Sequence, residues 1–282
     1  MRKRARIALA ILLLGITGIA AFRVLYPADR GPVYQGKPLR AWLRDYAGWD
    51  TTPKEWAQAK IAAEEAIRHI GTNAIPTLLK LVQKREPPRM SRLIDWWDQQ
   101  VANRNGFPIW LRHPSWYKNQ ARYMNLEGEI GFKILGAEAQ KAVPDLILIY
   151  ESTLSMDSVT AMFSRGAASH SLINIGPPAI PYFLSWADGT NEGKRLTAAY
   201  ALSQIHGEPS LVVPVLVKFL SHTNPLVRTE VVEGLGNFGT NAQPALPALV
   251  QSLSDSNRLV RNAATNAFKQ INPEMLTRVG VQ

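Results

Sequence analysis

The feature that most constrains the fold of this 282-residue chain is an internal repeat with a period of 33 residues. Residues 214–238 and 247–271 share nine identical positions out of twenty-five, far more than chance would give. A period of this length is typical of solenoids and other repeat arrays. A lone pair of short helices cannot bury its apolar faces, but stacked pairs can. The repeat therefore predicts an all-α solenoid of antiparallel helix pairs.

Asparagine recurs at one corner of the repeating unit. Asn191, Asn224 and Asn257 each stand just before a helical pattern, where an Asn side chain can accept a hydrogen bond from a free backbone N–H. Pro225 follows Asn224 at a position where a helix needs no N–H. We therefore expect helices to begin directly after these three asparagines.

Glycine and proline recur at the other corner. A Gly there is expected to end the first helix of a pair in the left-handed conformation. A Pro that follows within five to eight residues is expected at or near the start of the second helix. The glycines are Gly71, Gly136, Gly176, Gly207 and Gly239, and the prolines are Pro76, Pro144, Pro181, Pro214 and Pro244 or Pro247. We expect the last of these helices to begin near Pro244.

The repeat and its interruptions give the domain organisation. A helix with apolar positions Leu39, Trp42, Leu43 and Tyr46 is expected to cap the array. The array itself is expected over residues 39–282, with an insert at about 86–125 that breaks the period. The expected units are about 55–85, 126–152, 157–187, 191–222 and 224–254, followed by a last helix at 257–271.

The net charge of +10 is concentrated near the N-terminus. The first 50 residues carry nine basic and three acidic side chains, whereas residues 126–282 carry eleven and thirteen. A protein that follows a nucleic-acid backbone along its body needs a basic stripe there. Nucleic acid is therefore not an expected partner.

The sequence offers no recognisable catalytic or metal-binding motif. It has no Cys, which excludes disulfides, Cys-ligated metal sites and thiol catalysis. It also has no Gly-rich phosphate loop, HExxH or GxSxG, and its five His residues are far apart. We expect no catalytic residue, no metal ligand and no cofactor.

The N-terminus has the pattern of a membrane-targeting segment. A basic start, MRKRAR, precedes an uncharged apolar run at residues 7–22. Extended to Tyr26, the run would form a helix of about 30 Å, which matches the bilayer core if Arg23 reaches the interface. We expect residues 1–26 to be a single-pass anchor that binds the lipid bilayer through residues 7–26, and 27–38 to be a linker. The basic start would stay in the cytoplasm, with the body outside it. The alternative is a cleaved signal peptide and a secreted protein.

The repeating units resemble HEAT repeats, in the short form shared with the bilin-lyase-like HEAT family. The resemblance lies in the pattern D-x-x-x-x-V-R-x-x-A-x-x-A-x-x-x-I, which here comprises Asp255, Val260, Arg261, Ala264, Ala267 and Ile271. It covers roughly 55–85 and 126–271 and implies a right-handed, armadillo-like α-solenoid. The stretch 34–46 is similar to the lead-in of membrane-anchored bacterial HEAT-repeat proteins.

The resemblance also implies roles for particular residues. In HEAT proteins the Arg of this pattern braces neighbouring units, so Arg195, Arg228 and Arg261 are expected to form a structural ladder. Some bilin lyases and alkylpurine DNA glycosylases share the architecture, which keeps a lyase-like or glycosylase-like enzyme open as an alternative. The neutral to acidic array argues against a DNA enzyme.

The insert is the strongest candidate site in the sequence. Residues 86–125 hold seven of the chain's 24 aromatic residues, interleaved with Arg and Lys. Aromatic and Arg side chains together are typical of interface hot spots, and they also suit stacking on sugars or bases. The alternative is that they only pack a degenerate repeat. The candidate partner-docking residues are Trp96, Trp97, Trp110, Arg112 and Trp116.

Taken together, these patterns predict a non-catalytic scaffold of HEAT repeats on the outer side of a bacterial cytoplasmic membrane. Its partner would be a protein that the sequence does not identify. A periplasmic module that binds cell-wall glycan through the insert is the other alternative.

Overall fold

The computed structural model describes residues 31–49, 52–85, 120–156 and 159–278. The described chain opens with a small antiparallel hairpin, in which β1 (Val33–Tyr34) pairs with β2 (Lys37–Pro38). Gln35 and Gly36 both have positive φ, as a two-residue hairpin turn requires. The sequence analysis predicted an all-α fold and missed these two short strands.

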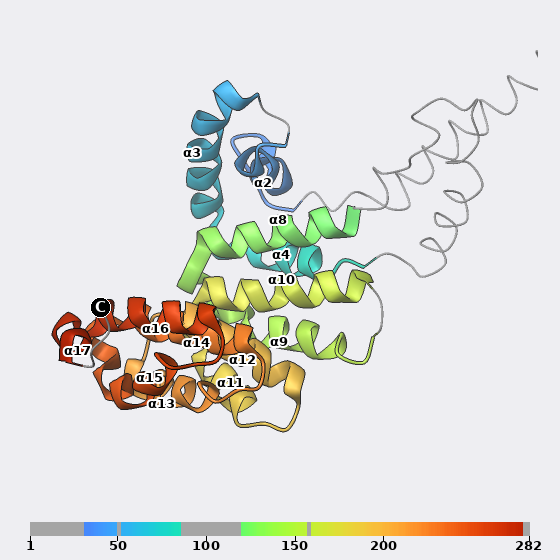
Figure 1. Cartoon of the computed structure of the whole chain (residues 1–282). Coiled ribbons are helices and arrows are strands. Elements are labelled where there is room, and N and C mark those ends of the chain that lie inside the picture. Colours follow the sequence, from blue (N-terminus) through green and yellow to red (C-terminus); the bar gives the residue numbers. More distant parts are fainter. Residues whose placement is uncertain (1–30, 50–51, 86–119, 157–158, 279–282) are drawn as a thin grey trace, which may run out of the picture.

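The rest of the described chain is helical, and its helices form antiparallel pairs (Figure 1). The capping helix predicted at Leu39 is confirmed as α2 (Leu39–Ala47), with Leu39 and Leu43 buried. The other helices are α3 (Pro53–Ile70), α4 (Ile75–Val82), α8 (Gln120–Leu135), α9 (Val143–Ser152), α10 (Val159–Ile175), α11 (Ile180–Ala187), α12 (Glu192–Gln204), α13 (Pro209–Phe219), α14 (Pro225–Asn237), α15 (Leu246–Ser252), α16 (Arg258–Ile271) and α17 (Pro273–Arg278).

The first helices of successive pairs pack against one another. Helix α8 packs on α10, α12 on α14, and α14 on α16. The second helices α9, α11, α13 and α15 lie along the opposite side of the array, while α2 and α3 stand at its N-terminal end (Figure 1). One hydrophobic core runs through the pairs, and the equivalent residues Leu216 and Leu249 are both fully buried in it.

The three asparagine caps are confirmed. The side chain of Asn191 accepts the backbone N–H of Lys194, and those of Asn224 and Asn257 accept the N–H groups of Leu226 and Leu259. Each helix starts one residue later, so the repeated Asn sets the register of the first helices.

The glycine and proline corner differs from the prediction in the fourth unit. Positive φ holds at four of the five glycines but not at Gly207, and here Glu208 takes the left-handed position instead. Helix α13 therefore begins at Pro209, and Pro214 lies inside it. In the fifth unit α15 begins at Leu246, not near Pro244, which lies in a short 3-10 helix.

Helix α8 begins inside the range assigned to the insert. Residues 120–125 are helical, so only the stretch before Gln120 separates α4 from the next pair. Helices α8 and α4 pack closely at Gly131, where a Cβ would lie 2.2 Å from Leu78 Cδ2. The Asn125 amide lies on the end of α4 and donates to the carbonyl oxygens of Leu81, Val82 and Lys84.

An ion pair ties the capping helix to the array. Arg40 donates from Nε and Nη2 to the two carboxylate oxygens of Glu127, at 2.6 and 3.1 Å. The Glu127 side chain is only 3% exposed, and a buried carboxylate is stable only when it is paired in this way. The hairpin and α2 therefore belong to the same body as the repeats.

Candidate functional site

Exposed apolar side chains recur on the first helices of the array. Leu226 on α14 and Leu259 on α16 hold the same position of the repeat, two residues after the capping Asn, and are 66% and 52% exposed. Leu126 on α8 and Met162 on α10 are also exposed. Leucine at such a position contributes little to the core, so the exposed side of these helices is a candidate contact surface.

This surface includes a groove between α12 and α14. It has a volume of about 210 Å³ and is open to solvent. Its lining comprises Leu196, Ala199, Tyr200, Leu226, Val227, Glu230 and Val231.

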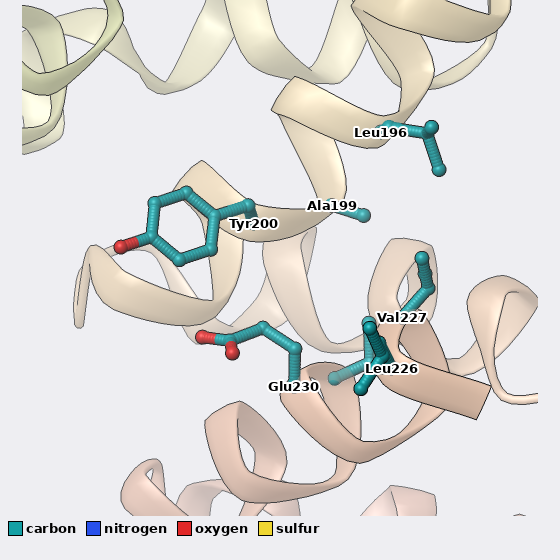
Figure 2. Close-up of a pocket in the computed structure, with 7 residues that line it drawn as sticks. Leu196, Ala199, Tyr200, Leu226, Val227 and Glu230 are labelled. Atoms are coloured by element: carbon teal, nitrogen blue, oxygen red, sulfur yellow. The ribbon is translucent and has the colours of Figure 1, made fainter. Parts of the chain in front are cut away.

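The groove has an apolar end and a polar end. Figure 2 shows Leu196 near Leu226 and Val227 on one side, while the Glu230 carboxylate extends towards the side of Tyr200. Gln204 Nε2 donates to Glu230 Oε1 at 2.7 Å, which fixes that carboxylate at the edge of the groove. An apolar side chain beside a hydrogen-bonding or cationic group would match this arrangement.

A second polar contact extends the surface towards α8. His170 on α10 lies 3.4 Å from Glu129 Oε2 on α8, and its ring centroid is 6.3 Å from that of Tyr200 on α12. The hydrogen bond to Glu129 raises the pKa of His170, against the opposing effect of burial. These contacts therefore link polar side chains of α8, α10 and α12.

The arginines expected to brace the repeats make different contacts. Arg228 binds both carboxylate oxygens of Asp255 in the following unit at 2.8 Å, and donates from Nη1 to the His222 and Thr223 carbonyls. Arg261 makes the equivalent backbone contacts to the Asp255 and Ser256 carbonyls. The Arg228 guanidinium lowers the pKa of Asp255, and the Asp255 carboxylate raises that of Arg228.

Arg195 departs from this pattern because its partner position is occupied by His222. The His222 Nδ1 accepts the N–H of Asn224 at 3.1 Å, as Asp255 Oδ1 accepts that of Asn257. The other ring nitrogen, Nε2, then donates to Glu192 at 3.0 Å, and Glu192 also binds Arg195 at 3.1 Å. The hydrogen bond from His222 lowers the pKa of Glu192. Arg195 is thus linked to the next unit through Glu192 and His222, and not through an Asp at the position equivalent to Asp255.

Several predicted features lie outside the described residues. These are the anchor at 1–26 and the candidate docking residues Trp96, Trp97, Trp110, Arg112 and Trp116. Within the described ranges, none of the helices is both long and apolar enough to cross a bilayer. The same ranges contain no cluster of His, Asp and Glu side chains that could hold a metal ion.

The groove was not predicted from the sequence, which gave Tyr200, Leu226 and Glu230 no role. The available signal was Leu226 and Leu259, which repeat at 33 residues yet fall off the core-facing stripe of their helices. An apolar residue that recurs outside the core stripe indicates a surface with another use.

Of the comparisons with known proteins, the one with protein families supports the helical repeat. Residues 180–269, from α11 to α16, match the family model of HEAT repeats. No curated protein matches the chain. Among solved structures, it is similar to the crystal structure of an engineered protein at 16% identity, over 83% of this chain and 96% of that chain, with a TM-score of 0.37. The C-terminal part of the array is therefore similar to HEAT repeats.

Proposed function

We propose that this chain is a non-catalytic protein-interaction scaffold that is displayed on the outer side of a bacterial cytoplasmic membrane. HEAT repeats commonly mediate protein interactions, and the groove between α12 and α14 is the observation that carries the proposal. It combines an open apolar floor with one carboxylate at its edge.

The charges around the groove indicate which kind of partner segment would bind there. Arg195 and Arg228 lie on the same two helices, but Glu192 and Asp255 respectively engage them. Within the described part of the chain, Glu230 is hydrogen-bonded to the uncharged Gln204 and Ser203, so its negative charge is available to a cationic partner. A segment of a protein partner with a large apolar side chain next to Arg or Lys would fit both ends.

The test is a binding titration of the full chain in detergent with matched synthetic peptides. The peptides would pair Leu or Phe with either Arg or Glu two to four residues away, and fluorescence anisotropy would report binding. We expect the Arg peptides to bind about tenfold more tightly, which corresponds to about 1.4 kcal/mol for one charge contact. In Glu230→Gln, the Arg peptides and the Glu peptides should bind with nearly equal affinity.

Leu226→Asp and Leu259→Asp form a matched pair for this experiment. Both residues are exposed and hold equivalent repeat positions, but only Leu226 lines the groove. We expect Leu226→Asp to abolish binding while Leu259→Asp leaves it nearly unchanged. Equal effects of the two variants, or no preference for Arg over Glu, would refute the groove as the docking site.

The insert remains a proposed second docking surface, on the strength of its Trp and Arg content. Trp110→Ala or Arg112→Ala should then abolish capture of a purified partner without lowering the melting temperature. If Trp110→Ala instead lowers stability, and its folded fraction binds normally, the insert has a structural role only.

A further inference from the structure

Exposed aromatic rings and a lysine gather at the N-terminal end of the array. Trp56 at the start of α3 is 41% exposed, and its Nε1 donates to the carbonyl of Tyr46 at the end of α2. The Lys60 ammonium lies 5.1 Å from the Tyr46 ring and 5.3 Å from the Trp56 ring. We call the group formed by Tyr46, Trp49, Trp56, Lys60 and Tyr123 the aromatic–basic patch.

The patch extends from α2 to the start of α8. Trp49 packs edge-on against Tyr123, with ring centroids 5.1 Å apart, and Tyr123 is 47% exposed. Tight packing fixes the patch, because a Cβ at Gly48, which has positive φ, would lie 2.8 Å from Trp56. The exposed rings are therefore held in place by the fold.

The charge around the patch favours an anionic surface. Residues 31–85 carry nine Lys and Arg against five Asp and Glu, but Lys80, Lys84 and Arg85 belong to α4 and its end and not to the patch. Lys37 is paired with Asp45 and Arg68 with Glu64, so Lys60 is the basic group that the patch itself presents. Trp and Tyr with nearby Lys are the residues that proteins place at membrane interfaces, and each basic residue near an anionic surface adds to the attraction.

The position of the patch along the chain brings a membrane within reach. The apolar stretch 7–26 ends five residues before Gly31, a distance that extended chain covers in about 18 Å at most. The Leu39 N–H donates to the Pro32 carbonyl, so α2 starts beside this entry point. Helix α2 has nine residues, about 14 Å, and the patch lies at its far end.

We propose that the aromatic–basic patch rests on the headgroup region of the same bilayer that holds the N-terminal stretch, with a preference for anionic lipid. This inference depends on the membrane anchoring proposed above. Tethering makes the contact intramolecular, so a weak surface affinity is enough to keep the patch on the lipid. The contact would orient the array, with α2 and α3 towards the membrane and α16 away from it (Figure 1).

The experiment uses the full chain, which contains no Cys, reconstituted into vesicles of phosphatidylcholine with or without phosphatidylglycerol. A single environment-sensitive fluorophore is attached at Ala57→Cys beside the patch or at Ser254→Cys in the loop before α16. A lipid with a spin label in its headgroup then quenches the fluorophore. We expect several-fold stronger quenching at position 57, and a larger difference in the anionic vesicles.

Lys60→Glu tests the patch without disturbing the core, and Lys269→Glu on exposed α16 is its control. The quenching at position 57 gives the ratio of patch bound to the lipid surface to patch free in solution. Lys60→Glu should lower this ratio at least about fivefold in anionic vesicles, given the usual attraction of one Lys to such a surface. Lys269→Glu should not change it. Equal quenching at positions 57 and 254 in chains that float with the vesicles would overturn the inference and leave anchoring intact. Chains that do not float at all would overturn both.

Discussion

Asp255 joins two neighbouring units through its carboxylate. One oxygen accepts the Asn257 N–H, and the two oxygens together bind Arg228. Both side chains of the pair are only 13% exposed, so the bonds are partly shielded from water. Hydrogen bonds to charged groups contribute more to folding stability than hydrogen bonds between neutral groups. The Arg228–Asp255 pair should therefore be an important link between neighbouring repeat units.

Asp255→Asn should therefore destabilise the chain at neutral pH, by about 1–2 kcal/mol. Because the pKa of Asp255 is lowered in the folded state, the stabilisation is fully present above the unfolded-state value of about 3.9 and is lost as pH falls through the folded value. Urea unfolding at several pH values should show the gap between wild type and Asp255→Asn closing only below that point. The exposed Glu233→Gln is the control, and a gap that already closes between pH 7 and 5 would contradict the assignment.

His170 should titrate above its usual range because Glu129 stabilises the imidazolium. In Glu129→Gln this favourable partner is lost while the burial remains, so the pKa of His170 should fall, as NMR of the ring proton would show. The same pair adds stability that is fully present below about pH 6.5 and is lost as pH rises through the raised value. An unchanged titration curve in Glu129→Gln would mean that the two side chains do not interact in solution.

At the scale of helices, glycine marks where two elements come closest. The side chain of Gly131→Ala on α8 would overlap Leu78 on α4, whereas a Cβ at Gly166 on α10 meets nothing within 4 Å. We expect Gly131→Ala to cost about 1–3 kcal/mol through overpacking. Gly166→Ala should stabilise α10 by up to about 1 kcal/mol, because Ala is the better helix former. Thermal unfolding of the two variants should shift in opposite directions, and a shared sign would mean that the α4–α8 packing is wrong.

The repeat register predicts which leucines hold the helix pairs together. Leu216 and Leu249 are equivalent and fully buried, so replacing either with Ala should cost about 2–5 kcal/mol. Leu226 is exposed, and Leu226→Ala should change stability by less than about 0.5 kcal/mol. Denaturant titrations of the three variants test this ranking. A loss below about 1 kcal/mol at Leu249 would invalidate the register.

Local sequence signals predicted some elements well and others poorly. The Asn caps were predictable because one side chain satisfies one backbone group within three residues. The start of α13 was wrongly predicted near Pro214. The turn before this helix has Glu208 in the left-handed conformation, and the helix begins five residues earlier, at Pro209. The recurring exposed Leu226 was a signal for part of the groove, but Tyr200 and Glu230 meet only through the packing of α12 on α14. The same holds for His222, whose bond to Glu192 spans 30 residues.

On the scale of the whole molecule, the basic N-terminus and the helical array are expected on opposite sides of the membrane. The MRKRAR start favours the cytoplasm, and the twenty nearly apolar residues that follow separate it from the repeats. If the stretch spans the bilayer, every exposed residue of the array must be on the other side. The Arg40–Glu127 pair joins α2 to α8, so the elements nearest the membrane and the repeats should share one topology.

Ser210→Cys and Ala5→Cys test this arrangement as a matched pair in the Cys-free chain. Ser210 is exposed in the first turn of α13, and Ala5 belongs to the basic start. We expect a membrane-impermeant maleimide to label Ser210→Cys in intact spheroplasts, and Ala5→Cys only after lysis, with both proteins in the membrane fraction. Labelling of Ser210→Cys only after lysis would refute the topology. A soluble product that begins near Ala21 would instead support cleavage of the segment and a secreted array.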